Sequence, residues 1–286
     1  MKKILERFLI FFIGLPLTVF LVVFLPQRHH LAANVVIVVF SGIGAVEFAN
    51  MLKRKNMLIP PIEAFILGIV GPLAMTLSVS FNIDHELVPA AFIIGSAWLL
   101  VSCVFSPENR FPDYLGHVAA GVSLMIYPGF FMLWIIRMFT WSRAEMTVLI
   151  FLLIVIMNDS AAWALGMLFG KGNKGIVPAS PNKSIAGFIG GSLGSVLVGI
   201  GAVILIPDVF NSRFMSGIPA GIILGLTTGA AANLGDLGES VMKRSAGIKD
   251  SGALIPGRGG VLDTIDSIAL GAPVFFVIYR LLFGFF

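Results

Sequence analysis

The residues of this chain that could do chemistry gather in one polar segment, residues 236–266, between two strongly apolar stretches. Charge beside lipid is costly, so a dense mixture of both signs next to apolar segments usually marks a site. Carboxylates can hold Mg²⁺, Lys and Arg can hold phosphate, and glycine lets backbone approach a ligand. The segment therefore favours phosphoryl or nucleotidyl transfer. Its carboxylates are Asp236, Glu239, Asp250, Asp263 and Asp266, and its cations are Lys243, Arg244, Lys249 and Arg258.

The spacing of these side chains predicts how they meet. If the helix before the segment continues past Asp236, then Asp236, Glu239 and Lys243 lie on one face, because side chains three and four residues apart are neighbours on a helix. Asp263 and Asp266 share a face if the next helix begins near them. Carboxylates that converge from two helices form a reasonable cradle for Mg²⁺, completed by substrate phosphate and water.

The alternative is a solvated loop whose carboxylates pair with neighbouring Lys and Arg side chains. Gly257, Gly259 and Gly260 favour a site over such a loop, because closely spaced glycines are typical of backbone held against a ligand.

A second signal is Asp159, which follows the apolar stretch FLLIVIMN. An ionisable residue inside a membrane helix is a functional candidate by default, and a structural hydrogen bond to a neighbouring helix is the alternative. The next residues, 170–186, are expected to form a flexible cationic loop, with a helix beginning near Ser184. Glu47, deep in another apolar run, has no evident partner in the sequence.

The composition places the chain in a membrane. Its 286 residues are 57% hydrophobic and only 12% charged, with a mean hydropathy of +0.98, whereas soluble domains carry about 25% charged residues. The net charge of +4 does not indicate nucleic-acid binding, because membrane proteins concentrate Lys and Arg in cytoplasmic loops. The single cysteine, Cys103, excludes an intrachain disulfide, and the four histidines have no metal-ligand spacing.

The hydropathy pattern predicts an all-α polytopic membrane protein with about nine transmembrane helices, because each needs about 20 mostly apolar residues. Residues 1–146 would hold about five of these helices, and residues 147–286 the catalytic region with its loops 170–186 and 236–266. The segments are Phe8–Leu25, Leu31–Leu52, Ala64–Val79, Val88–Phe105, Gly116–Ile135, Thr147–Leu168, Gly187–Ile206, Ser216–Gly235 and Ser267–Phe286.

Charge bias orients these segments. An N-terminus in the cytoplasm puts most of the 19 Lys and Arg residues on the cytoplasmic side, as the positive-inside rule requires. Nine crossings then place the C-terminus outside, and both polar loops face the compartment that contains nucleotides. Glycine pairs such as Gly187 with Gly191 and Gly190 with Gly194, extended by Ser195 with Gly199, predict close helix packing.

The polar segment also resembles a known signature. Residues Ser240 to Asp266 resemble the pattern S-x-x-K-R-x-x-x-x-K-D-x-G-x-x-I-P-x-H-G-G-x-x-D-R-x-D of the phosphatidate cytidylyltransferases, the CDP-diacylglycerol synthases. Further upstream, Asp159 to Gly166, Gly170-Lys171 and Ser180 to Ser184 resemble the D-x-x-A-Y-x-x-G, G-K and S-P-K-K-T elements of that family. The resemblance covers roughly the C-terminal half of the chain.

The resemblance implies an inner-membrane enzyme that faces the cytoplasm and joins CTP and phosphatidate, with Mg²⁺ as cofactor and no nucleic acid as partner. A second, monovalent cation and a homodimer are left open. The metal would be held or supported by Asp236, Asp263, Asp266 and Asp159. Phosphate would be held by the cations Lys243, Arg244, Lys249 and Arg258, with Asp250 orienting one of them. Substrate would be bound by Ser240, Gly259 and Gly260, and the lipid phosphate by Ser180 and Lys183.

The chain departs from the pattern at several positions. Arg258 replaces the motif histidine and Thr264 the motif arginine, while Trp163 and Asn182 replace a Tyr and a Lys. Three alternatives follow: a CTP-dependent lipid kinase, a catalytically weakened relative with a scaffold role, and a transporter. A transporter would spread its polar residues around a midplane cavity in repeated halves, whereas here they collect at one edge without a second copy.

Overall fold

The structure is a computed structural model that describes residues 10–104, 107–210 and 217–284, which are helical and contain no β-strand. Four of the predicted segments have their first or last residue outside the described residues: Phe8, Phe105, Ser216 and Phe286. The elements are η1 (Ile10–Gly14), α2 (Leu15–Phe24), α3 (Gln27–Lys53), α4 (Pro61–Phe81), α5 (Leu87–Val101), η2 (Glu108–Asp113), α6 (Tyr114–Leu124), η3 (Met125–Phe130), α7 (Leu133–Met138), α8 (Ala144–Phe169), α9 (Ile185–Leu205), α10 (Gly217–Ser245) and α11 (Leu262–Phe283).

Seven helical stretches within the described residues are long and apolar enough to cross a membrane. They are α3, α4, the run Phe111–Met138, α8, α9, α10 and α11. The two other predicted segments form shorter apolar helices, Phe12–Phe24 and Leu87–Val101. The all-α, multi-pass membrane class is confirmed, while the count of nine crossings stays a prediction.

The chain divides into two compact units, one of residues 1–140 with 245–265 and one of residues 141–244 with 266–286. The polar segment 236–266 is therefore shared between them. The division predicted at residue 146 stays a prediction.

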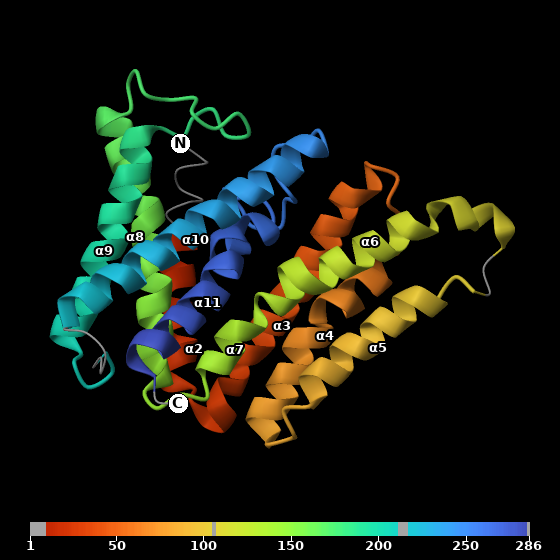
Figure 1. Cartoon of the computed structure of the whole chain (residues 1–286), viewed down its shortest axis with the longest axis horizontal. Helices are drawn as coiled ribbons and strands as arrows, with labels where there is room; N and C mark the ends of the chain where they lie inside the picture. The colour runs from red at the N-terminus through yellow and green to blue at the C-terminus, as the bar shows by residue number, and fades with distance from the viewer. Residues whose placement is uncertain (1–9, 105–106, 211–216, 285–286) are drawn as a thin grey trace. The chain divides into compact units, whose positions relative to one another are not determined.

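The first unit is built around α3 and α4, which pack through small residues (Figure 1). A Cβ atom on Gly68 of α4 would lie 2.3 Å from the Cβ atom of Ala45 on α3, and one on Gly42 would lie 2.4 Å from the ring of Phe65. Regular helix in α3 is preceded by a left-handed turn, with φ between 51° and 58° at Arg28, His29 and His30. Regular helix therefore begins after His30, next to the predicted start at Leu31.

The second unit holds α8, α9 and α10, and the predicted close packing of its glycines is confirmed. A Cβ atom on Gly194 would lie 2.8 Å from the carbonyl oxygen of Met157 on α8. On the other side of α9, a Cβ atom on Gly199 would lie 2.1 Å from the carbonyl oxygen of Gly221 on α10. Figure 1 shows α8 and α9 side by side, as their contacts require.

Local signals set the ends of the helices that carry the polar residues. The side chain of Ser184 caps α9 by accepting a hydrogen bond of 3.0 Å from the N–H of Gly187, so the predicted helix start is confirmed. α10 continues to Ser245, which confirms that Asp236, Glu239 and Lys243 share one helix. A left-handed Gly247, with φ 69°, follows its end.

Candidate functional site

A pocket of about 430 Å³ lies in the second unit, between α8, the loop after it, the start of α9, and α10. Its wall is amphiphilic. The charged and amide side chains are Asp159, Lys174, Asn182, Lys183, Asn233 and Asp236, and the large apolar ones are Trp163, Met167 and Phe188. A pocket of this composition can hold a ligand with a charged head and an apolar body.

Lys183 and Asp236 form an ion pair in this pocket, with 2.6 Å between Nζ and Oδ2. Both side chains are partly exposed, at 23% and 32%. The ammonium group of Lys183 also lies 5.6 Å from the centre of the Phe188 ring, which helps to hold the cation in place. The structure thus brings Asp159, Lys183 and Asp236, three predicted site residues, to one pocket.

The loop between α8 and α9, predicted to be a flexible cationic loop, is held in a defined conformation by hydrogen bonds of its own backbone. The N–H of Lys183 donates to the carbonyl of Ser180 (3.0 Å), and the N–H of Gly175 donates to that of Lys183 (3.2 Å). Gly175 has φ 80°, a conformation that glycine adopts at no steric cost. These bonds hold Lys183 at the pocket. Ser180 lies one turn before Lys183 and is not among the residues that line the pocket.

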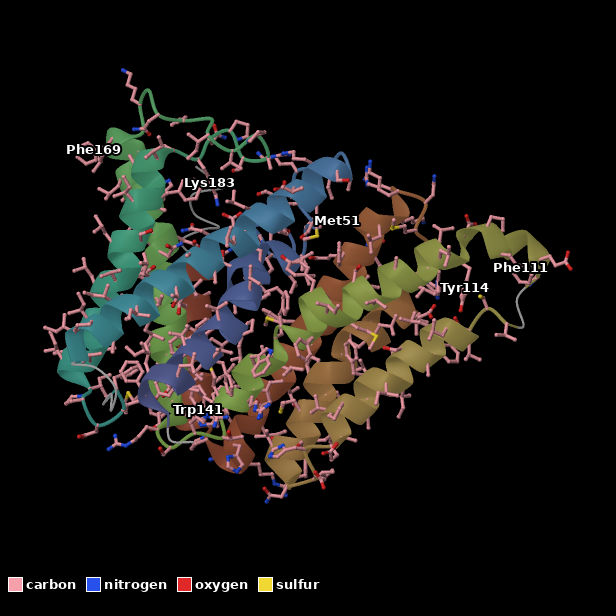
Figure 2. All side chains as sticks on the ribbon, in the orientation of Figure 1. Met51, Phe111, Tyr114, Trp141, Phe169 and Lys183 are labelled. Atoms are coloured by element: carbon pink, nitrogen blue, oxygen red, sulfur yellow. The ribbon has the colours of Figure 1, made fainter. Side chains whose placement is uncertain are left out.

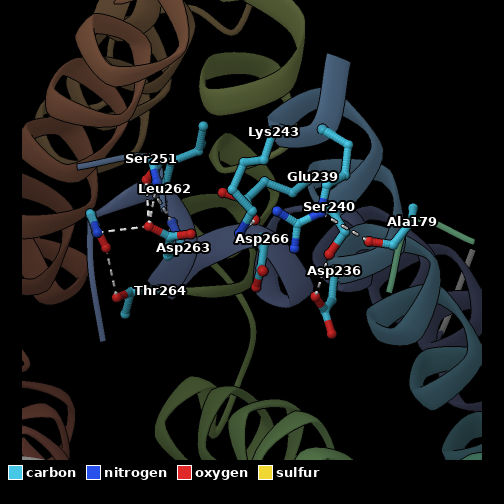
Figure 3. A network of polar contacts seen from close by, with 12 residues as sticks. Ala179, Asp236, Glu239, Ser240, Lys243, Ser251, Leu262, Asp263, Thr264 and Asp266 are labelled. Atoms are coloured by element: carbon cyan, nitrogen blue, oxygen red, sulfur yellow. Dashed lines mark hydrogen bonds and ion pairs between the residues drawn. The ribbon is translucent and has the colours of Figure 1, made fainter. Parts of the chain in front are cut away.

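The last turns of α10 carry further predicted residues. Lys243 pairs with Glu239, a carboxylate with no exposed surface, at the i, i+4 spacing of one helix face. The hydroxyl of Ser240 lies 3.5 Å from Oδ1 of Asp236, and Nε of Arg244 donates to the carbonyl of Ala179 at 3.4 Å (Figure 3). Arg244 therefore connects α10 to the loop that contains Ser180.

Asp263 organises the part of the signature that lies in the first unit. Its Oδ2 accepts hydrogen bonds of 2.7 Å from the N–H of Ser251, the hydroxyl of Ser251 and the N–H of Gly260 (Figure 3). A Cβ atom on Gly259, where φ is 117°, would lie 2.6 Å from the same oxygen. The close approach expected at these glycines is thus made to a carboxylate of the protein itself, and their role in binding substrate stays a prediction.

Glu47 of α3 lies in the same network, which sequence reasoning missed. Its carboxylate accepts hydrogen bonds from the N–H groups of Val261 (3.0 Å) and Leu262 (2.8 Å) and from the hydroxyl of Ser251 (3.0 Å). The usable signal was the cost of an ionisable side chain in an apolar helix, which demands a partner. The sequence did not say where that partner lies.

Sequence reasoning also missed a pair of side-chain amides at the pocket, the buried Asn158 and the half-buried Asn233, which lines it. The side chains of Asn158 on α8 and Asn233 on α10 donate to each other's carbonyl oxygen, at 3.1 and 3.2 Å, and the hydroxyl of Ser195 on α9 donates to Asn158 at 3.2 Å. Asn158 directly precedes Asp159, and Asn233 lies one turn before Asp236. The amide pair therefore sets the register of the two helices that bring these carboxylates to the pocket.

The other predicted residues are not gathered at the pocket. Lys249, Asp250 and Arg258 are exposed in the first unit, and Asp266 is buried near the start of α11 in the second. Across residues 10–104, 107–210 and 217–284, no three His, Cys, Asp or Glu side chains form a ready group of metal ligands. Because the four predicted metal residues are divided between the units, the metal set stays a prediction.

Comparison with known proteins gives a match over almost the whole chain. A family model described as the cytidylyltransferase family matches residues 5–282. Phosphatidate cytidylyltransferases are similar over most of their length: that of Staphylococcus saprophyticus is 32% identical over 260 residues, and that of Staphylococcus aureus strain COL is 30% identical over 256. Each alignment covers 89% of this chain and 93% of the relative. The enzyme of Haemophilus influenzae is 44% identical over 124 residues, 42% of this chain and 41% of that protein.

Proposed function

The chain belongs to the cytidylyltransferase family, and from that premise we propose that it transfers the cytidylyl group of CTP to phosphatidate, giving CDP-diacylglycerol and pyrophosphate. The observation that carries the proposal is the alignment of 89% of the chain with proteins named phosphatidate cytidylyltransferase. That alignment includes the N-terminal helices as well as the signature, so the likeness is not that of a shared motif alone.

The chemistry suits the residues present. A phosphate oxygen of phosphatidate attacks the α-phosphorus of CTP, a bond forms between them, and the bond from that phosphorus to the bridging oxygen of pyrophosphate breaks. The attacking oxygen is already anionic, so the protein needs no strong general base. Its main task is to bring crowded phosphates together and to stabilise the charge in the transition state.

The pocket in the second unit supports binding of the lipid substrate. Lys183 and Lys174 offer positive charge to a phosphate, while Trp163, Met167 and Phe188 offer apolar surface to what is attached to it. The exposed apolar side chains at the end of α8, such as Phe169, point outward (Figure 2). The acyl chains would therefore reach the pocket sideways from the bilayer.

Mg²⁺ fits the side chains at this pocket. Asp159 and Asp236 both line it, and Mg²⁺ in nucleotide enzymes is usually held by one or two carboxylates, with waters and substrate phosphates as the other ligands. We propose that Asp236 and Asp159 hold or support the ion, whose charge would neutralise the phosphates. That Asp263 and Asp266 also serve the metal stays a prediction from the sequence. Asp236 also pairs with Lys183 at the same pocket.

The remaining cations would hold phosphate. Lys243 and Arg244 on α10 and Lys249 and Arg258 on the loop can each bind phosphate oxygens, arginine in a fork of two donors. Asp250, beside Lys249, would orient one of these cations. We place this machinery on the cytoplasmic side of the inner membrane, because nucleotides are found there and the positive-inside rule favours that orientation.

The direct test gives purified protein phosphatidate, CTP labelled on the α-phosphate and Mg²⁺, and then identifies the lipid product. We expect labelled CDP-diacylglycerol, no product in EDTA, and recovery on adding Mg²⁺. If the protein is stably folded and no label enters the lipid, the proposal is contradicted. Turnover that persists in EDTA would contradict the metal assignment.

A further inference from the structure

The buried carboxylate of Glu47 is a charged group that the proposed chemistry does not use. It lies on α3, in the N-terminal half of the chain, and only 7% of the residue is exposed. An ionised side chain in an apolar helix is retained only where its charge is compensated. The compensation comes from three donors that lie more than 200 residues away along the chain, in the signature segment.

Two of these donors form the N-terminus of α11. The first N–H groups of a helix have no partner inside the helix and carry the positive end of its dipole. The N–H groups of Val261, the residue before α11, and of Leu262, its first residue, donate to Oε1 and Oε2 of Glu47 at 3.0 and 2.8 Å. Glu47 therefore occupies the position that a bound anion takes at many helix N-termini.

The third donor connects Glu47 to Asp263. The single hydroxyl hydrogen of Ser251 is shared between Oε2 of Glu47, at 3.0 Å, and Oδ2 of Asp263, at 2.7 Å, and the backbone N–H of Ser251 also donates to Asp263. The two ends of the signature loop, residues 251–262, are thus held together around the carboxylates of Glu47 and Asp263.

The glycines of the loop fit closely around Glu47. A Cβ atom on Gly252 would lie 2.4 Å from Oε1 of Glu47, and one on Gly260 would lie 2.3 Å from Oε2. Both distances are far inside van der Waals contact, so a side chain at either position would displace the carboxylate. Gly252, Gly260 and Glu47 therefore form one packed unit.

We propose that Glu47 is a positioning residue that fixes the conformation of the signature loop, residues 251–262, and the start of α11. The loop carries Arg258, follows Asp250 and leads to Asp263, so its shape decides where these groups meet phosphate. The catalytic consequence rests on the proposed function. The structural part does not, because it concerns only contacts of Glu47 with other residues of the chain.

Amide hydrogen exchange tests the structural part. Glu47→Gln keeps the size of the side chain but turns one acceptor into an amide group that faces an N–H donor. We expect the amides of Val261 and Leu262 to exchange at least about tenfold faster, because the first turn of α11 offers them no other acceptor. The matched control is Asn34→Ala on the same helix, which removes a buried amide bonded to the carbonyl of His29 and the hydroxyl of Ser80.

Asn34→Ala should lower thermal stability but leave exchange at residues 261–262 unchanged. Equal exchange in Glu47→Gln and the parent would overturn the proposal. If Glu47→Gln does not accumulate in the membrane, Glu47→Asp carries the test, because it keeps the charge but withdraws it by one methylene. Faster exchange at the same two amides supports the proposal, and unchanged exchange overturns it.

Activity per folded molecule tests the catalytic part. We expect kcat/KM to fall about tenfold or more in Glu47→Gln and in Ser251→Ala, and the double variant to lose much less than the product of the two losses, because both changes open one network. Asn34→Ala should keep parental kcat/KM. Independent, multiplicative losses would mean that Glu47 does not act through this loop. If exchange changes but the parent makes no CDP-diacylglycerol, the proposed function fails and the positioning role stands.

Discussion

At the residue scale, charged side chains of the pocket already pair with one another, so a bound substrate would compete with or join such pairs. Asp236 is the clearest case, because Lys183 holds one of its oxygens at 2.6 Å while the side chain remains partly exposed. An exposed pair of this kind contributes little to stability. Its placement on facing elements of a pocket therefore points to a role in ligand binding.

Changing Asp236 should affect activity far more than folding. Asp236→Asn keeps the size but removes the charge that would hold Mg²⁺ and orient Lys183, so we expect kcat/KM to fall by about two orders of magnitude or more. The unfolding midpoint in detergent should move by no more than a few degrees. Steady-state kinetics and thermal unfolding on one preparation measure both. Parental activity in this variant would remove Asp236 from the site.

Arg258 and Thr264 are the two places where the signature departs from the family pattern. Arg258 is exposed and its N–H donates to the carbonyl of Ile255 in a tight turn, whereas the Thr264 hydroxyl donates to the carbonyl of Gly260 inside the first turn of α11. Arginine stays charged and cannot transfer a proton, so an electrostatic role fits it. The number of permanent cations in the stretch equals that of the family pattern.

If that role is neutralisation of phosphate, Arg258→Ala should lower kcat/KM at least about tenfold. Arg258→His with Thr264→Arg should then retain more activity than Arg258→His alone. These three variants can be compared with the parent in one CTP titration. Parental turnover in Arg258→Ala, or no recovery in the double variant, would show that the cation at residue 258 is dispensable.

At the element scale, α8, α9 and α10 pack through glycines and through the hydrogen bonds that join Asn158, Ser195 and Asn233. Gly225 of α10 offers a test, because a Cβ atom there would lie 2.3 Å from the carbonyl oxygen of Ser195, a backbone atom that cannot rotate away. Gly201 of α9 is the matched control, since nothing lies within 4 Å of a Cβ atom at that position.

Gly225→Ala should destabilise the protein by about 1–3 kcal/mol, the usual cost of forcing extra volume into a packed contact. Gly201→Ala should be neutral or slightly stabilising, because alanine is the better helix former. Thermal unfolding in detergent measures both. Similar midpoints for the two variants would mean that α9 and α10 are not packed as closely as their backbones indicate.

The same helices show which parts of the structure the sequence could predict. Hydropathy and the spacing of Gly190, Gly194 and Gly199 predict long helices and close packing, because both are local patterns. The partners of Glu47 could not be predicted, since they lie 204 to 215 residues away and an apolar helix pattern carries no information about pairing. The Asn158–Asn233 pair was hidden for the same reason.

At the scale of the whole molecule, the orientation in the membrane follows from charge bias and the number of crossings. An odd number of crossings places the two termini on opposite sides. We expect a reporter inserted between Lys171 and Lys183 to be active in the cytoplasm and one fused after Phe286 to be active outside. Reporters active on the same side would show that an even number of segments separates the two positions.

The measurement that tests the central claim most directly follows two labels through one reaction of the purified protein with phosphatidate and Mg²⁺. With CTP labelled on the α-phosphate, label should enter the lipid, and with CTP labelled on the γ-phosphate, it should leave as pyrophosphate. A lipid kinase would instead put the γ-label into lipid and release CDP. Recovery of γ-label in the lipid would contradict cytidylyl transfer.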